Sequence, residues 1–549
     1  MAGFQTLLSF RTDDGAGIPQ DHWSRLFFEH IFCGFDDADF AGMYEEGGRY
    51  PVSPSLLSCI TILQYMFAAS DRVAVENTIM RRDWRIALGL TRDYAGFDTS
   101  VLCGFRQRLA AHGRADELFG TVLGKVGELS LLTNRRRLRV DATAVVAEVA
   151  RLSRAEVIEE AMRVVVCDLY DNYPELGERP DLLRLHEAYS KEVWVGGGSS
   201  GAQKLRALGH DGYLLLELCG SREVKGKETL AQILDENFVL SEEQEPQPRA
   251  PDERPKDRIA TPHEPDVRYG RKRDKSWLGD KAHLVETADE GRTNFVTDVV
   301  VTDPRAEDST VLPEIAQRAR FTMPEADTLM ADQGYASARN SREAAELGLE
   351  LIAPPRASNR RGKIPISEFD IDFERQVARC PEGHESVVWS PAGRAINIRF
   401  RERDCTACPR RTECTDSRQG RTIAPSREYE QLQRDRQRAT TAEFAKLYRL
   451  RAPIDATISE LVHCCGLRRS RYRGAPFRAL HVLLAATALN VRRSLGCLAT
   501  EQGWEPRDAS ALRALASPLA LQPLPRISAI LSCLFGAMTA RCAFANASA

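Results

Sequence analysis

Three aspartates that lie far apart in this 549-residue chain each stand in or beside a run with a regular pattern. Asp141 lies within the alternating run RLRVDATAVV, and Asp332 follows the apolar residues of TLMADQGYAS, so both runs predict strands. Asp455 lies in a stretch whose apolar residues recur at spacings of three and four, which predicts a helix. A fold that gathers these side chains must place helices against a sheet, so the expected fold class is α/β.

The three carboxylates predict a cation site. Two like charges about 4 Å apart repel by roughly 4 kcal/mol at an effective dielectric near 20, so such a cluster is favourable only around a cation. Magnesium and manganese prefer oxygen ligands, and two such ions can hold the attacking and leaving oxygens of a phosphodiester. Taken singly, Asp141 and Asp332 are equally well explained as residues that turn or close a strand. On the predicted helix, Asp455 shares a flank with Arg451, whereas Glu460 lies on the opposite flank, so Asp455 is the preferred third acid.

A net charge of −3 hides a local cluster of arginines after the third acid. The cluster consists of Arg468, Arg469, Arg471 and Arg473. Arginines neutralise phosphates whatever the base sequence, so this cluster favours DNA contact, although a solvated face is the usual reason for such a run. Tyr448 and Arg451 are expected to support the DNA backbone and to orient the acid or a phosphate.

The chain has fourteen cysteines and no evident N-terminal secretory signal, so we expect reduced thiols in a cytoplasm. Four of them have the spacing C-x24-C-x2-C-x5-C and are Cys380, Cys405, Cys408 and Cys414. Four soft ligands suit a structural zinc ion, and ordinary reduced cysteines are the alternative. His384 lies shortly after the first cysteine. The apolar run Ile527–Ala540 is too short to span a bilayer, so no membrane partner is expected.

Changes in composition and patterning predict five segments along the chain. They are a helical N-terminal domain for DNA binding or assembly (1–130), the first part of the core (131–353), a Cys-rich insertion (354–427), the rest of the core with the third acid and the basic cluster (428–500), and a C-terminal tail (501–549). Within the first part of the core, 152–236 is expected to be a helical insertion and 241–266, which is rich in Pro and charged residues, a mobile linker. Arg106, Arg108 and Arg114 are candidates for DNA contact in the first domain, and a solvated basic face is an equal alternative.

The motifs carry a family resemblance. RVDAT, then ADQGY, then Y-x2-R-x3-acid followed by GLRRSRYRG resemble the pattern of bacterial insertion-sequence transposases with an RNase H-like DDE core. The closest likeness is to the branch often called the eleven-eighty-two group. The likeness includes VSPSLLSCITILQYMFAASDR near the start, DVRYGRKRDKSWLGDKAHL in the middle and LHVLLAATALNVRR late in the chain.

This resemblance implies an RNase H-like mixed sheet in which Asp141 and Asp332 lie on neighbouring strands and the third acid projects from a helix. It implies an enzyme that cuts transposon ends and joins 3′-hydroxyl ends to target DNA, with Asp141, Asp332 and Asp455 holding two Mg²⁺ or Mn²⁺ ions. The implied partners are double-stranded DNA, as terminal inverted repeats and target, and further copies of the chain. The implied location is the cytoplasm, in association with the nucleoid.

Three positions depart from the family pattern. The third acid is normally Glu, and Asp455 is one methylene shorter. Gly279-Asp280-Lys281 replaces a frequent Gly-Tyr-Lys, and Val462-His463 stands where a basic residue is frequent. The alternative function is therefore a DNA-binding derivative of a transposase whose catalysis is weakened or lost.

Overall fold

The computed structural model describes residues 17–44, 52–192, 201–272, 274–355, 363–393 and 395–501. The predicted C-terminal tail and its apolar run lie almost wholly outside these residues. The chain divides into two compact units. The first comprises Met1–Arg108, Glu460–Gly466 and Thr487–Ala549, and the second comprises Leu109–Ser459 and Leu467–Ala486.

The first unit begins with helices, as the sequence predicts. They are α1 (Trp23–His30), the short η1 (Phe32–Gly34) and η2 (Asp37–Met43), α2 (Pro54–Met66), α3 (Asp71–Met80), α4 (Arg82–Ala87) and α5 (Thr99–Ala111). Ser53 and Ser70 cap α2 and α3 by accepting hydrogen bonds from backbone N–H groups of the first turn. Every residue of α2 is buried, which explains why its apolar residues occur all around the helix.

One arginine proposed for DNA contact in this unit is unsuitable. Arg106 is buried, and its guanidinium forms a 2.5 Å ion pair with Asp71 and contacts Gln64. Arg108 lies over the ring of Tyr44, with its central carbon 4.9 Å from the ring centroid. Arg106 therefore links α5 to both α2 and α3, a role that a basic residue in an amphipathic pattern does not reveal.

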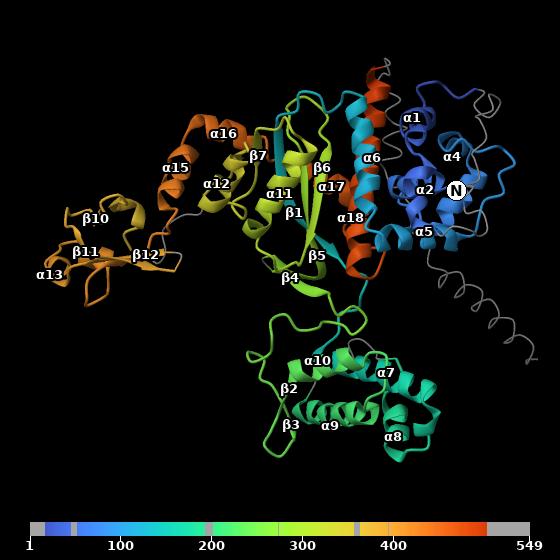
Figure 1. Ribbon diagram of the computed structural model, residues 1–549, viewed down its shortest axis with the longest axis horizontal. Helices are drawn as coiled ribbons and strands as arrows, with labels where there is room; N and C mark the ends of the chain where they lie inside the picture. Colours follow the sequence, from blue (N-terminus) through green and yellow to red (C-terminus); the bar gives the residue numbers. More distant parts are fainter. Residues whose placement is uncertain are drawn as a thin grey trace, which may run out of the picture. The chain divides into compact units, whose positions relative to one another are not determined.

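A six-stranded mixed sheet forms the core of the second unit (Figure 1). Its strands are β1 (Arg137–Val146), β4 (Arg268–Lys272), β5 (Lys275–Thr287), β6 (Val296–Thr302), β7 (Thr328–Met330) and β8 (Glu350–Ile352). The order is β4-β5-β1-β7-β8, and β6 also pairs with β5. Strand β5 runs antiparallel to β1, β4 and β6, whereas β1, β7 and β8 run parallel. This mixed sheet confirms the predicted α/β class and is consistent with an RNase H-like core.

Helices α11 (Asp308–Thr322), α12 (Ala338–Glu346) and α16 (Ala442–Arg449) pack against strands β6 and β8 of this sheet. The remaining helices outside the two insertions are α6 (Ala115–Glu128), α15 (Tyr429–Ala439), α17 (Ile454–Cys464) and α18 (Ala475–Glu501). Val140 of β1 and Val285 of β5 are buried in one cluster with Ile315 of α11. Because side chains alternate along a strand, Asp141 and Thr143 project from the opposite face of β1 to Val140.

The segment expected to be a helical insertion is helical and has a core of its own. Its helices are α7 (Arg154–Asn172), the short η3 (Pro174–Leu176), α8 (Pro180–Tyr189), α9 (Ala202–Cys219) and α10 (Lys227–Asn237). Ser153 and Glu156 form a capping box at the start of α7, with each side chain bonded to the other's backbone N–H. Buried aliphatic residues from all four long helices pack in one cluster.

The segment predicted to be a mobile linker is fixed at its C-terminal end. After β2 (Phe238–Leu240) and β3 (Pro246–Pro248) pair, the chain is irregular, but Ile259 is buried. Glu264 is also buried and forms an ion pair with Arg478, and it accepts a 3.1 Å hydrogen bond from the N–H of Gly474. The composition of this segment predicted mobility because it has few apolar residues, and its ion pair with Arg478 leaves no local pattern in the sequence.

The Cys-rich insertion is a module of short strands. They are β9 (Asp370–Asp372), β10 (Val377–Arg379), β11 (Ser386–Ala392), β12 (Ala395–Phe400) and β13 (Thr422–Ile423), with helices α13 (Glu402–Thr406) and α14 (Arg411–Cys414). Strands β9 and β10 pair antiparallel, and β11, β12 and β13 form a separate antiparallel sheet.

Helix α18 is long and apolar enough, by length and composition, to cross a membrane. Most of an 18-residue apolar window within Ala475–Thr500 is buried inside the protein. A buried core helix has this composition for packing reasons.

Candidate active site

Asp141 lies in the middle of the sheet. It is on β1 opposite Leu284 of β5, and only 7% of its surface is exposed. Its Oδ2 accepts a 2.8 Å hydrogen bond from Nη2 of Arg451, and its Oδ1 accepts one of 2.7 Å from the N–H of Ala142. Burial raises the pKa of Asp141 and the charge of Asp332 raises it further, whereas Arg451 and Ala142 oppose the rise. The site therefore favours a cation beside Asp141.

Asp332 lies next to Asp141, as the family resemblance implies. It follows β7, which runs parallel to β1 with Met330 opposite Arg139. Its Oδ1 accepts a 2.7 Å hydrogen bond from the N–H of Gly334, and its Oδ2 lies 3.9 Å from Nη2 of Arg451. One guanidinium thus faces both carboxylates, so Asp141 and Asp332 form a pair with a shared cation.

Asp455 does not join this pair. It is exposed in the first turn of α17, and among the described residues no three Asp, Glu, His or Cys side chains are placed to hold a metal ion. Arg451 lies in a turn before α17, which begins at Ile454 after Pro453. The prediction that Arg451 and Asp455 share a helix flank is therefore wrong. Proline has no backbone N–H to donate into a preceding turn, so it begins the helix after itself.

A buried ion pair positions the turn that carries Arg451. Arg139 and Glu286 face each other across β1 and β5, with 2.7 Å between Nη2 and Oε1. Nη1 of Arg139 donates to the carbonyl of Leu450, and Oε2 of Glu286 accepts from the hydroxyl of Thr457 on α17. The residues just before and just after the turn are thereby held against the sheet.

The basic cluster lies along the end of β1. Arg469 bridges Val146, and the guanidinium of Arg468 donates to the carbonyl of Ala144 at 2.6 Å and to the hydroxyl of Thr143 at 3.2 Å. Because Thr143 and Asp141 share a face of β1, Arg468 lies on the face that carries the aspartate pair. Arg469 and Arg473 are exposed, and Arg471 is partly buried.

Tyr448 has a packing role in this structure. Its ring stacks on that of Phe444, with 5.9 Å between centroids, and it packs against an apolar cluster that contains Met330 and Ile352. These contacts support α16 against the sheet. Contact of Tyr448 with DNA stays a prediction.

Two segments of the chain match known families. Residues 379–495 match the family described as Transposase DDE domain, and residues 15–108 match Transposase domain (DUF772). The chain carries the domains of an insertion-sequence DDE transposase. No curated protein and no solved structure matches this transposase. The first match covers the four cysteines, Asp455 and the basic cluster, and neither match tests the assignment to the eleven-eighty-two group.

The transposase has a polar layer near the aspartate pair to which sequence reasoning gave no role. Lys281 donates to Asp308 at 3.0 Å, and Nδ1 of His283 lies 2.6 Å from the hydroxyl of Tyr335. A Cβ on Gly334 would lie 2.7 Å from Oδ2 of Asp308 and 2.9 Å from Oδ1 of Asp332, so a larger residue there would have to displace these carboxylates. Asp308 therefore lies beside the candidate metal pair. The motifs GDKAHL and ADQGY contain Lys281, His283 and Tyr335 and could have indicated this polar layer. The family resemblance rests partly on these motifs but assigns no role to the three residues.

Proposed function

We propose that this transposase cuts the ends of its own insertion sequence and joins the freed 3′-hydroxyl ends to target DNA, with a divalent cation at the aspartate pair. The observation that supports this proposal most directly is that the guanidinium of Arg451 faces both aspartates. Its Nη2 lies 2.8 Å from an oxygen of Asp141 and 3.9 Å from an oxygen of Asp332. Two acids on adjacent parallel strands would otherwise repel each other. The arrangement suits a site for positive charge.

The donor atoms fit Mg²⁺ or Mn²⁺, which prefer carboxylate oxygens. Asp141 and Asp332 would hold the ion, and Asp455 is assigned as the third acid from its place in the Y-x2-R-x3-acid motif alone. When bound, the cation supplies Lewis-acid stabilisation of charge on the reacting phosphodiester oxygens. Arg451 must leave the pair for a cation to take its place, and a DNA phosphate is a suitable new partner for its guanidinium.

The arginines on the same face would bind DNA. Arg468 is held by β1, and the exposed Arg469 and Arg473 extend the positive surface from the aspartate pair. Contacts of this kind fix the register of the duplex without reading its sequence. The proposed partners are terminal inverted repeats and target DNA, bound in the cytoplasm by more than one copy of the chain.

Cleavage of labelled terminal repeats tests the catalytic assignment. We expect Mg²⁺-dependent nicking that is lost in Asp141→Asn and in Asp332→Asn. Asp303→Asn is the matched control, because Asp303 lies after β6 and pairs with Arg305 at 2.7 Å. Full cleavage by both site variants would overturn the proposal.

Asp455 needs a separate test because the structure leaves it outside the pair. We expect Asp455→Asn to lose cleavage and Asp455→Glu, which restores the acid usual in the family, to retain it. Glu460→Gln is the control on the same helix, since Glu460 pairs with Arg493. Unchanged cleavage by Asp455→Asn would remove this residue from the site and leave the assignment of Asp141 and Asp332 intact.

A further inference from the structure

The Cys-rich module has a small apolar core for its length. In the described part of residues 363–426, the buried apolar side chains are Ile364, Phe369, Ala378, Ile398, Phe400 and Ile423. Helices α13 and α14 have only five and four residues. A unit of this size rarely stabilises itself by apolar burial alone, and disulfides or a metal ion usually supply the rest. Since all four of its cysteines are free thiols, disulfides do not.

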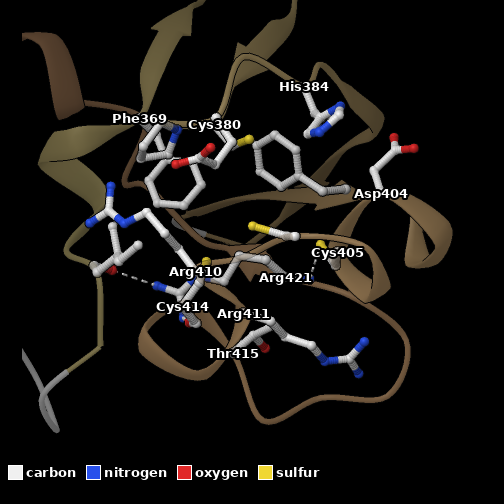
Figure 2. Close-up of a pocket in the computed structure, with 15 residues that line it drawn as sticks. Phe369, Cys380, His384, Asp404, Cys405, Arg410, Arg411, Cys414, Thr415 and Arg421 are labelled. Carbon is white, nitrogen blue, oxygen red and sulfur yellow. Dashed lines mark hydrogen bonds between the residues drawn. The ribbon is translucent and has the colours of Figure 1, made fainter.

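These four cysteines gather from separate elements. Cys380 follows β10, Cys405 lies in α13, Cys408 follows α13 and Cys414 ends α14. All four line one pocket with a volume of about 30 Å³, which is large enough to hold a water molecule. Figure 2 shows Cys380, Cys405 and Cys414 around this space. His384 also lines it but is exposed to solvent.

The turn after Cys380 brings the first thiol to the others. The N–H of Cys380 donates to the carbonyl of His384, and the N–H of Gly383 donates back to the carbonyl of Cys380 at 2.8 Å. Gly383 has φ +85°, a conformation that favours glycine. The sequence CPEGH thus forms a tight turn that carries Cys380 at one end.

Arg421 provides a second, independent sign of negative charge at this pocket. Its backbone N–H donates to Sγ of Cys405 at 3.3 Å, and its guanidinium donates to the carbonyls of Cys414 and Ile364 (Figure 2). Nε of Arg421 is buried and, among the described residues, has no hydrogen-bond partner. A buried donor without a partner costs about 1–3 kcal/mol, so an acceptor is expected there.

We propose that Cys380, Cys405, Cys408 and Cys414 bind one zinc ion as four thiolates, and that Arg421 offsets the negative charge of the resulting centre. Four thiols release four protons to solvent on binding, which leaves a centre of net charge −2. Thiolate sulfur accepts hydrogen bonds from N–H groups, and Arg421, whose backbone N–H already donates to Cys405, lines the pocket. The sulfurs are not yet at metal-binding separations, because no three ligating groups among the described residues meet that condition. Zinc binding therefore requires the four sulfurs to approach one another.

The metal content of the purified full-length protein tests this inference. We expect one zinc per chain by elemental analysis, and a thiolate-to-cobalt charge-transfer band with tetrahedral d–d bands when Co²⁺ replaces zinc. This optical test uses the wild-type protein and so does not depend on the folding of a variant. Absence of zinc together with absence of the band under reducing conditions would overturn the proposal. Neither outcome depends on DNA cleavage, so this inference fails or stands separately from the proposed function.

Variants test which residues bind the zinc ion and whether Arg421 supports its binding. Cys408→Ala is expected to lose zinc, whereas Cys167→Ala keeps it, because Cys167 is also partly buried but lies in the helical insertion. Arg421→Gln is expected to keep zinc but to lower its affinity about 10-fold or more, as loss of a residue beside the ligands typically does. The exposed Arg403→Gln is the control. Equal zinc affinity in Arg421→Gln and the wild type would remove Arg421 from the site.

Discussion

At the scale of single residues, Arg451 decides whether the aspartate pair accepts a cation. Its guanidinium lies 2.8 Å from Asp141 and 3.9 Å from Asp332. A charge about 4 Å away contributes roughly 1–4 kcal/mol in partly solvated surroundings. We therefore expect Arg451→Gln to raise the affinity of the DNA-free protein for Mn²⁺ about tenfold, measured by the electron paramagnetic resonance of free Mn²⁺. The exposed Arg449→Gln, on α16, should leave this affinity unchanged. Equal affinities in the wild type and Arg451→Gln would show that the guanidinium and Mn²⁺ do not compete for one position.

A second residue-scale prediction concerns pH. His283 is fully buried, and burial lowers its pKa to about 4, while Asp308 opposes and Lys281 adds to the shift. Between pH 6.5 and 4, His283 binds a proton in the unfolded chain but stays neutral in the folded chain. The contribution of neutral His283 to the free energy of unfolding is therefore complete above pH 6.5. It decreases by on the order of 3 kcal/mol as the pH drops toward 4.

Urea denaturation across this pH window measures the effect. His283→Gln should show a smaller loss of unfolding free energy between pH 6.5 and 4 than the wild type. The exposed His112→Gln should retain the loss of the wild type. Parallel pH profiles for the wild type and His283→Gln would show that other groups are responsible.

At the scale of elements, the buried pair of Arg139 and Glu286 fixes the turn before α17. Glu286→Gln leaves Arg139 buried without its charge partner, which typically costs about 3 kcal/mol or more. We expect that loss in the free energy of unfolding. Glu460→Gln should cost less than about 1 kcal/mol, because its pair with Arg493 is one-third exposed on the Glu460 side. Similar losses in the two variants would argue against the role of the buried pair.

The elements themselves were mostly predictable from periodicity. The strands around Asp141 and before Asp332, and helices α11 and α12, follow from alternation and from spacings of three and four. Two features were not predictable. The place where α17 begins depends on Pro453, and the anchoring of Glu264 depends on Arg478, which lies far along the chain. Long-range ion pairs leave no local pattern in a sequence.

A long-range ion pair explains one of the three positions that depart from the family pattern. Asp280, which stands where Tyr is frequent, forms a 2.5 Å ion pair with Arg478. Gly279 before it has φ +145°, and a Cβ there would lie 2.0 Å from the carbonyl oxygen of Val145. The residue at 280 thus serves the fold. For Asp455 the structure offers no comparable reason.

At the scale of the whole molecule, DNA affinity should fall with salt according to the number of phosphates that the arginines neutralise. Each phosphate contact adds about one unit to the slope of log affinity against log salt. We expect Arg473→Gln to reduce that slope by about one, measured by titration of terminal-repeat DNA at several salt concentrations. The exposed Arg206→Gln, on α9 of the insertion, should not change the slope. An unchanged slope for Arg473→Gln would take the basic cluster out of the interface.

How much of the candidate site was predictable also depends on scale. The motifs placed Asp141 and Asp332 correctly on neighbouring elements, but the cation that faces them was expected on the helix with Asp455. Lys281, His283 and Tyr335 had no assigned role because their partners come from different strands and turns. A single sequence contains no record of which polar residues meet after folding.

The anchoring of Glu264 has a mechanical consequence. Glu264 lies where the chain returns from the helical insertion to β4, and it is bonded to Gly474 and Arg478 at the start of α18. Gly474 directly follows the arginine segment. We therefore expect a displacement of the insertion, such as docking of another molecule on its helices, to act through Glu264 on Gly474 and Arg478, and so on the end of the arginine segment.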